Sequence, residues 1–114
     1  IPCLPLRHPD YFIQQHTPVQ LQYQAERAEK AYEHYFKRTH GEDKHEILVS
    51  HGNLIRYFVC KAMGADPGAW LGMESYNCGI TRITVHEDGL CSVLSYNDVG
   101  HLPPELRTDN FHPI

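Results

Sequence analysis

The chain has 114 residues, a length typical of one domain. Hydrophobic residues make up 41% and charged residues 21% of the sequence, which indicates a folded protein and argues against intrinsic disorder. The formal net charge is -4 and the ten Lys and Arg residues are scattered, so we expect no nucleic-acid partner. No apolar run approaches the roughly 18 residues that span a bilayer, so we expect neither a membrane span nor a signal peptide.

The cysteine and histidine positions indicate free thiols and no metal centre. The four cysteines lack paired short spacing, and Cys60 lies in a very apolar segment, which favours a buried thiol in a reducing, intracellular compartment. The other three are Cys3, Cys78 and Cys91. Nine histidines are many for this length, but no two lie four residues apart on one predicted helix, and no cysteine pair adds further ligands. We therefore expect no metal and no other cofactor.

The N-terminal third predicts a lead-in segment followed by a long helix. Residues 1–16 contain three prolines, which favours an extended or looping conformation. For residues 18–38 we predict an amphipathic helix, because Thr17 is a favourable N-cap, a proline follows it, and Gln20 stands where a capping box needs it. Its apolar positions recur every three or four residues: Leu21, Ala25, Ala28, Tyr32 and Tyr35. A polar loop at 39–44 follows it.

The middle of the chain predicts a strand, a tight turn and a buried helix. The apolar run Ile47-Leu48-Val49 favours a strand over residues 46–50 that is covered on both faces, as in a parallel sheet. A turn at 51–53 follows it. The next apolar residues have helical spacing, and Gly64 supplies the stop.

The last third predicts a β-hairpin and an irregular tail. Residues 80–85 and 90–96 each alternate between two faces, and the turn residues 87–89 lie between them. From Asn97 onwards we expect irregular structure. The fold class is therefore α/β, with two helices and about three strands. Because sheets commonly hold about four to six strands, we infer that residues 1–114 are the back half of one larger domain.

The turn after the predicted strand is the candidate site. In α/β sheets, ligands lie beyond the carboxyl ends of the strands, where a helix N-terminus offers unpaired N–H groups. Gly52 permits close approach of the backbone, the amides around Asn53 can donate to phosphate oxygens, and His51 adds a donor. A phosphoryl group is the expected ligand. The alternative is that His51 only caps the helix and Gly52 only turns the chain.

Other residues near this turn are open to two interpretations. Arg56 can reach a phosphate or pair with a neighbouring carboxylate. His101 is a candidate for the mouth of the site or for packing of the tail, and Asn77 is a candidate to support the His51 turn. Trp70 and Tyr76 either flank the pocket or are buried aromatic residues.

Three segments of the sequence resemble the histidine phosphatase superfamily, which has the phosphoglycerate mutase-like fold. Ile47-Leu48-Val49-Ser50-His51-Gly52-Asn53-Leu54-Ile55-Arg56 resembles its second-histidine motif. Residues 77–81 are similar to the segment that opens its next strand, and residues 97–102 to its closing motif. Residues 51–62 are most similar to mitochondrial Ser/Thr protein phosphatases of this family. The resemblance implies the C-terminal half of a three-layer α/β/α domain, with residues 1–16 as lead-in and 17–114 as helix, strand-turn-helix, hairpin and tail.

The chain departs from the family pattern at the nucleophile. Family members attack phosphorus with a histidine in an upstream Arg-His-Gly motif, whereas Arg7-His8-Pro9 has proline in place of glycine and follows no apolar strand. We do not expect His8 to be a nucleophile. The resemblance implies that His51 stabilises charge on the phosphoryl group, with Gly52 and Asn53 binding phosphate. The isolated chain is therefore predicted to be inactive.

Three functions follow as hypotheses. The leading one is an intact protein that hydrolyses phosphoserine and phosphothreonine in proteins through a phosphohistidine. The alternatives are a non-catalytic pseudo-phosphatase binding module, and a phosphoglycerate mutase or small-molecule phosphatase. The resemblance also implies a phosphorylated protein or peptide as partner, a homo-oligomer, and an intracellular location, namely the mitochondrion.

Overall fold

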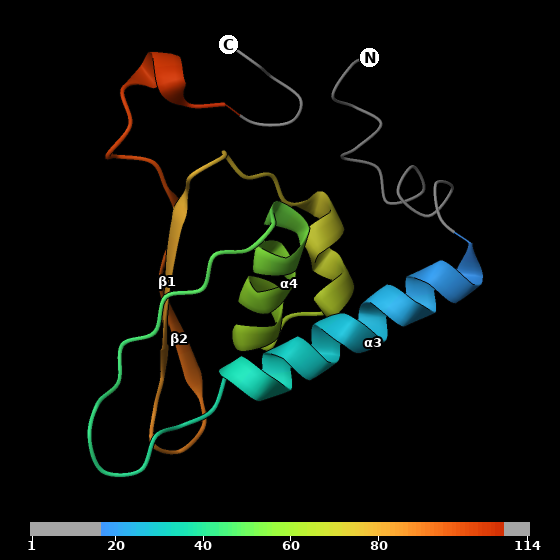
Figure 1. Cartoon of the computed structure of the whole chain (residues 1–114), viewed down its shortest axis with the longest axis vertical. Helices are drawn as coiled ribbons and strands as arrows, with labels where there is room; N and C mark the ends of the chain where they lie inside the picture. The colour runs from blue at the N-terminus through green and yellow to red at the C-terminus, as the bar shows by residue number, and fades with distance from the viewer. Residues whose placement is uncertain (1–16, 109–114) are drawn as a thin grey trace.

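The computed structural model describes residues 17–108. The lead-in segment 1–16, which includes Cys3 and His8, lies outside the described residues. Two α-helices and one two-stranded sheet form the main body, and two 3-10 helices complete it (Figure 1). In chain order the elements are α3 (Pro18–Tyr35), α4 (Gly52–Ala62), η1 (Pro67–Gly72), β1 (Ile80–Val85), β2 (Cys91–Asp98) and η2 (Pro104–Leu106).

Helix α3 begins as the sequence predicts and ends three residues earlier than predicted. The Thr17 side chain accepts a hydrogen bond from the Gln20 N–H at 3.1 Å, and the Gln20 side chain accepts one from the Thr17 N–H at 2.8 Å. This capping box satisfies two N–H groups that the helix itself leaves unpaired. At the other end Phe36 leaves helical geometry, and its ring stacks on Tyr32 and packs against Phe58 of α4. Aromatic packing therefore accompanies the early end of the helix.

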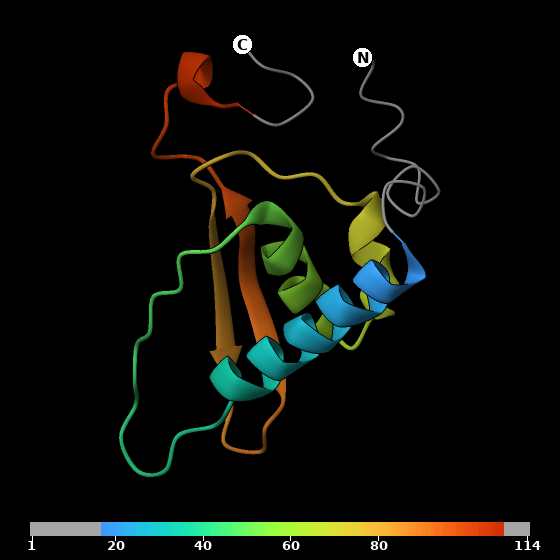
Figure 2. The same cartoon turned by 45° about the vertical axis from the view of Figure 1, so that its right-hand side comes forward.

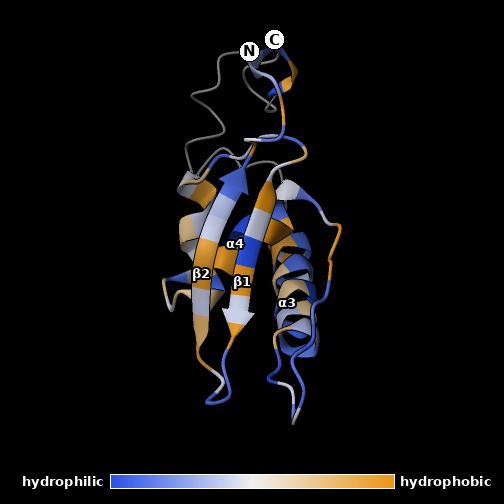
Figure 3. Cartoon of the chain, turned by 90° about the vertical axis from the view of Figure 1, so that its left-hand side faces the viewer, coloured by the Kyte–Doolittle hydropathy of each residue, from blue (hydrophilic) through white to orange (hydrophobic). Residues whose placement is uncertain are grey.

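The strand predicted over residues 46–50 is not formed. The segment is part of an irregular connection between α3 and α4, and the Ile47 and Val49 side chains are 91% and 96% exposed. A strand needs hydrogen-bonded neighbours, and the two strands of the described residues pair only with each other. The hydrophobic part of this connection stands out at the edge of the molecule (Figure 3). The prediction of three strands is therefore wrong for this structure, because the apolar run finds no partner strand.

Helix α4 confirms the predicted buried helix and supplies the core. Its residues Phe58, Val59 and Cys60 are buried, and Gly64 ends the helix in a left-handed conformation with φ of 71°. Cys60 is a free thiol, as expected, and so are the other two cysteines of residues 17–108. Burial raises the pKa of the Cys60 thiol.

Glu29 of α3 joins the two helices. Its Oε2 accepts hydrogen bonds from the Tyr57 hydroxyl at 2.7 Å and from the Lys61 ammonium at 2.8 Å, both on α4. Burial and the bond to Glu29 raise the pKa of Tyr57 to about 12, so its hydroxyl stays protonated and can donate. This three-residue link fixes how α3 crosses α4.

The predicted hairpin is confirmed, and the helices lie on one of its faces. β1 and β2 are antiparallel, and a turn with Gly89 at φ of 84° connects them. Helix α4 contacts both strands, while no helix of residues 17–108 covers the opposite face of the sheet (Figures 2 and 3). The strand β2 runs on to Asp98, and η2 interrupts the tail that the sequence predicts to be irregular. The arrangement is a mixed α/β fold with one helical layer on the described sheet.

The 3-10 helix η1 was not predicted from the sequence. Asp66 precedes it, and its side chain accepts a hydrogen bond from the Gly68 N–H at 2.9 Å. A proline follows this cap, which suits the start of a helical turn.

Among residues 17–108, no helix has the length and apolarity to cross a membrane.

Candidate phosphate site at the start of helix α4

The predicted site turn lies at the N-terminus of α4. His51 is the N-cap residue, with extended backbone, and its carbonyl accepts the first helical hydrogen bond from the Ile55 N–H at 3.0 Å. Its side chain makes no capping hydrogen bond and the residue is exposed. His51 therefore caps α4 through its backbone, as the alternative has it, and its imidazole takes no part in the cap. The imidazole is accessible to a ligand in front of the helix.

The first amides of α4 offer donors next to this imidazole. Within the described part of the chain, the N–H groups of Gly52, Asn53 and Leu54 have no protein acceptor. Such N–H groups carry the positive end of the helix dipole and attract anions. Amides and imidazole together form a donor set suited to a phosphoryl group.

The space around Gly52 is tight. A Cβ atom at this position would lie 3.1 Å from Ser75 Oγ and 3.3 Å from Arg56 Nη2, so these side chains would have to shift. From the sequence, Gly52 was expected to let an anion approach the backbone or only to turn the chain. The structure adds Ser75 as a neighbour of the site turn, and no periodic pattern in the sequence identifies that residue.

The Arg56 guanidinium is hydrogen-bonded to two residues of the site turn, Gly52 and Asn53. Arg56 is 8% exposed; its Nε donates to the Gly52 carbonyl at 3.0 Å, and its Nη1 donates to the Met73 carbonyl at 2.6 Å. Its Nη2 donates to Asn53 Oδ1 at 2.6 Å, and the group lies over the Trp70 ring. Burial lowers the pKa of Arg56 from its ordinary value, and the field of Tyr96 and Glu74 opposes this. A guanidinium remains charged under such conditions.

The segment after η1 forms the wall against which Arg56 packs. The Tyr96 hydroxyl of β2 donates to the Glu74 carbonyl at 2.6 Å, and Cys60 Sγ lies 3.4 Å from Met73 Sδ. The Tyr76 N–H donates to the Asn97 side chain at 3.0 Å. Contacts from both α4 and β2 therefore fix residues 73–76 beside the site turn.

Asn77 is bonded to the C-terminal tail, and His101 lies in that tail. Asn77 donates its backbone N–H and its side-chain amide to Thr108, at 2.7 and 3.2 Å. His101 is exposed in the turn after β2. In this turn the Gly100 N–H donates to Asp98. That hydrogen bond, together with the charges of Arg82 and His101, lowers the pKa of Asp98. The structure thus groups His51, Gly52, Asn53 and Arg56, and no hydrogen bond of the described residues joins Asn77 or His101 to them. Their pocket roles stay predictions.

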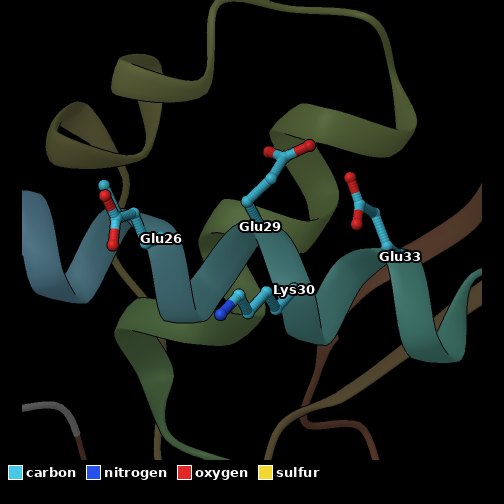
Figure 4. A pocket seen from close by; sticks show the side chains of 5 residues that line it. Glu26, Glu29, Lys30 and Glu33 are labelled. Carbon is cyan, nitrogen blue, oxygen red and sulfur yellow. The ribbon is translucent and has the colours of Figure 1, made fainter.

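A surface pocket on α3 does not suit a phosphate. Ala25, Glu26, Glu29, Lys30 and Glu33 line it. Figure 4 shows three carboxylates and one ammonium projecting from this helix, so an anion would meet net repulsion there. The donors at the start of α4 are the better anion site. Residues 17–108 contain no group of three His, Cys, Asp or Glu side chains that could hold a metal ion.

Comparison with known proteins places the chain in a family. The family model described as "Histidine phosphatase superfamily (branch 1)" matches residues 7–99. The chain belongs to the histidine phosphatase superfamily. The resemblance seen in the sequence is thereby confirmed.

Curated members of this superfamily resemble the chain over part of their length. It is 45% identical over 84 residues to "Serine/threonine-protein phosphatase Pgam5, mitochondrial" of Caenorhabditis elegans, which covers 71% of this chain and 30% of that protein. It is 32% identical over 105 residues to "Serine/threonine-protein phosphatase PGAM5, mitochondrial" of Mus musculus, which covers 88% of this chain and 36% of that protein. The matched region thus spans about a third of these relatives.

Proposed function

We propose that the protein carrying this chain is a phosphatase that hydrolyses phosphoserine and phosphothreonine in proteins through a phosphohistidine intermediate. The observation that carries the proposal is the exposed His51, whose side chain makes no capping hydrogen bond, beside the amides of Gly52 and Asn53, which have no acceptor among residues 17–108. The names of the curated relatives support the substrate class. This chain contributes the anion-binding half of the site.

The reaction is two in-line transfers. First, a histidine outside the described residues attacks phosphorus and the bond to the serine or threonine oxygen breaks. An acidic group, also outside the described residues, gives this oxygen a proton as the alcohol leaves, and takes a proton back from the water of the second step. Second, water attacks the phosphohistidine, which releases inorganic phosphate and restores the histidine. In both steps His51 and the first amides of α4 donate to the equatorial phosphoryl oxygens, where negative charge is held. His51 does not become phosphorylated.

We propose further that residues 17–108 are the C-terminal part of a three-layer α/β/α domain. The exposed Ile47 and Val49 side chains support this, because a parallel strand buries both of its faces. The mitochondrial relatives support a mitochondrial location. A homo-oligomer remains a prediction from the family resemblance.

A trapping experiment separates this function from its alternatives. The full-length protein is mixed with a phosphopeptide that carries labelled phosphate, quenched in alkali, and analysed for labelled phosphohistidine and released phosphate. We expect both products, and orthovanadate should inhibit their formation. Binding of vanadate without release of phosphate would indicate a pseudo-phosphatase. Faster turnover of a phosphorylated sugar acid than of the phosphopeptide would indicate a small-molecule enzyme.

A further inference from the structure

The orientation of the Asn53 side chain is fixed by its partner. Arg56 Nη2 lies 2.6 Å from Asn53 Oδ1. A guanidinium has only donors, so the carboxamide must present its oxygen to Arg56. The oxygen and nitrogen are bonded to the same amide carbon and point in different directions, so the Asn53 NH₂ group is not used by the bond to Arg56. Asn53 itself is exposed at the first turn of α4.

Arg56 is well held in its own right. Its Nε and Nη1 are bonded to the carbonyls of Gly52 and Met73, and more than nine-tenths of the residue is buried. The third bond, to Asn53, therefore connects an exposed side chain to a fixed internal group. Such support restricts the rotamers of a binding residue before the ligand arrives.

We propose that Arg56 is a positioning residue that presents the Asn53 NH₂ group as a side-chain donor to the bound phosphoryl group. This inference rests on the proposed function and adds a side-chain contact to the backbone amides of the α4 turn. Arg56 acts through Asn53 and does not itself touch the phosphate. Three of its five N–H groups are bonded to Gly52, Met73 and Asn53, and the residue is 8% exposed.

A double-mutant cycle on the full-length protein tests the proposal, with inhibition by orthovanadate as the measured quantity. Asn53→Ala should raise the inhibition constant about tenfold, the usual effect of losing a hydrogen bond to a charged group. Arg56→Lys should raise it several-fold, because one ammonium cannot bond three acceptors in a fixed fork. The loss in the double variant should be clearly smaller than the product of the two single losses, because part of the effect of Arg56 passes through Asn53. Additive losses would overturn the proposal.

Two further variants separate positioning from folding. Asn53→Asp keeps an oxygen for Arg56 but removes the donor and adds negative charge, so the melting temperature should hold while the inhibition constant rises about tenfold or more. Arg38→Lys is the matched control, because Arg38 bonds the Glu87 carbonyl far along the chain, and it should leave the constant unchanged. An unchanged constant in Asn53→Asp would also overturn the proposal.

The wild-type protein distinguishes the two levels of failure. If it neither releases phosphate from a phosphopeptide nor binds orthovanadate, the proposed function and this inference both fail. If it does both, and the inhibition constants of orthovanadate for the Asn53 variants equal that of wild type, this inference alone fails.

Discussion

Gly79 packs directly against Asn97, so closely that a Cβ atom at Gly79 would collide with the Asn97 side chain and lie 3.3 Å from its Cα. Asn97 occupies the left-handed region with φ of 54°. Its side chain accepts from the Tyr76 N–H, and its own N–H donates to Thr81 Oγ1 at 3.1 Å. Gly79 and Asn97 together hold the start of β1 beside the segment that supports the site.

Gly79→Ala should therefore destabilise the full-length protein by about 1–3 kcal/mol, the usual cost of forcing an extra atom into a packed contact. Urea denaturation gives the comparison. The control is Gly72→Ala, because a Cβ at Gly72 meets no atom within 4 Å. Equal midpoints for the two variants would contradict the argument.

Glu29→Gln should weaken the junction of the two helices in a pH-dependent way. The bonds from Lys61 and then Tyr57 hold the pKa of Glu29 below its ordinary value of 4.5. A carboxyl with a lowered pKa stabilises the fold above its ordinary pKa, and this contribution is lost as the pH falls through the lowered value. Wild type should thus be more stable than the variant near neutral pH, and the two should converge as the pH falls through the lowered pKa of Glu29.

Thermal melting across this pH range provides the measurement. Glu33→Gln on the same helix is the matched control, because Glu33 makes no ion pair within residues 17–108. A difference between wild type and Glu29→Gln that persists unchanged into acid would argue against the cross-helix link.

Ile47→Ala tests whether the exposed segment becomes a buried strand in the full-length protein. A buried isoleucine cut to alanine costs about 2–5 kcal/mol, whereas an exposed one costs about 0.5 kcal/mol or less. We expect the larger loss in chemical denaturation. Leu90→Ala is the control and should have little effect, because Leu90 lies in the hairpin turn and is 67% exposed. A small loss for Ile47→Ala would contradict the three-layer domain.

The isolated chain should lack phosphatase activity and melt at low temperature. Oxyanion donors without an attacking group leave only weak catalysis, and the buried apolar core of residues 17–108 consists of Phe58, Val59 and Cys60. A phosphopeptide assay and a thermal melt on residues 1–114 check both statements. Robust turnover that His8→Ala abolishes would contradict the first, and a sharp transition at high temperature the second.

Local signals in the sequence were sufficient for most of the elements. Thr17 with Gln20, and the glycines Gly64 and Gly89, act within a few residues of their own positions, so the start of α3, the end of α4 and the hairpin turn could be predicted. The strand over 46–50 could not be judged locally, because it depends on partner strands. Its apolar pattern is typical of a buried strand, but the rest of residues 17–108 leaves Ile47 and Val49 exposed.

The candidate site also has a part that local sequence signals identify and a part that depends on contacts between distant segments. His51, Gly52 and Asn53 are adjacent in sequence, so a motif could identify them. The bond from Arg56 to the Met73 carbonyl spans seventeen residues, and a backbone carbonyl leaves no trace in the residue type. Three hydrogen bonds of Arg56 go to neutral oxygens, and Glu74 acts on its guanidinium through the electrostatic field. Direct contact of Arg56 with a phosphate stays a prediction.

The most direct test of the account is the turnover number of His51→Ala in the full-length protein on a phosphopeptide. A single preorganised donor aimed at developing charge is worth a few kcal/mol, so we expect a loss of about 10²-fold or more. His45→Ala, in the exposed connection before α4, should keep wild-type turnover. A loss of about tenfold or less for His51→Ala would contradict its role on the phosphoryl group.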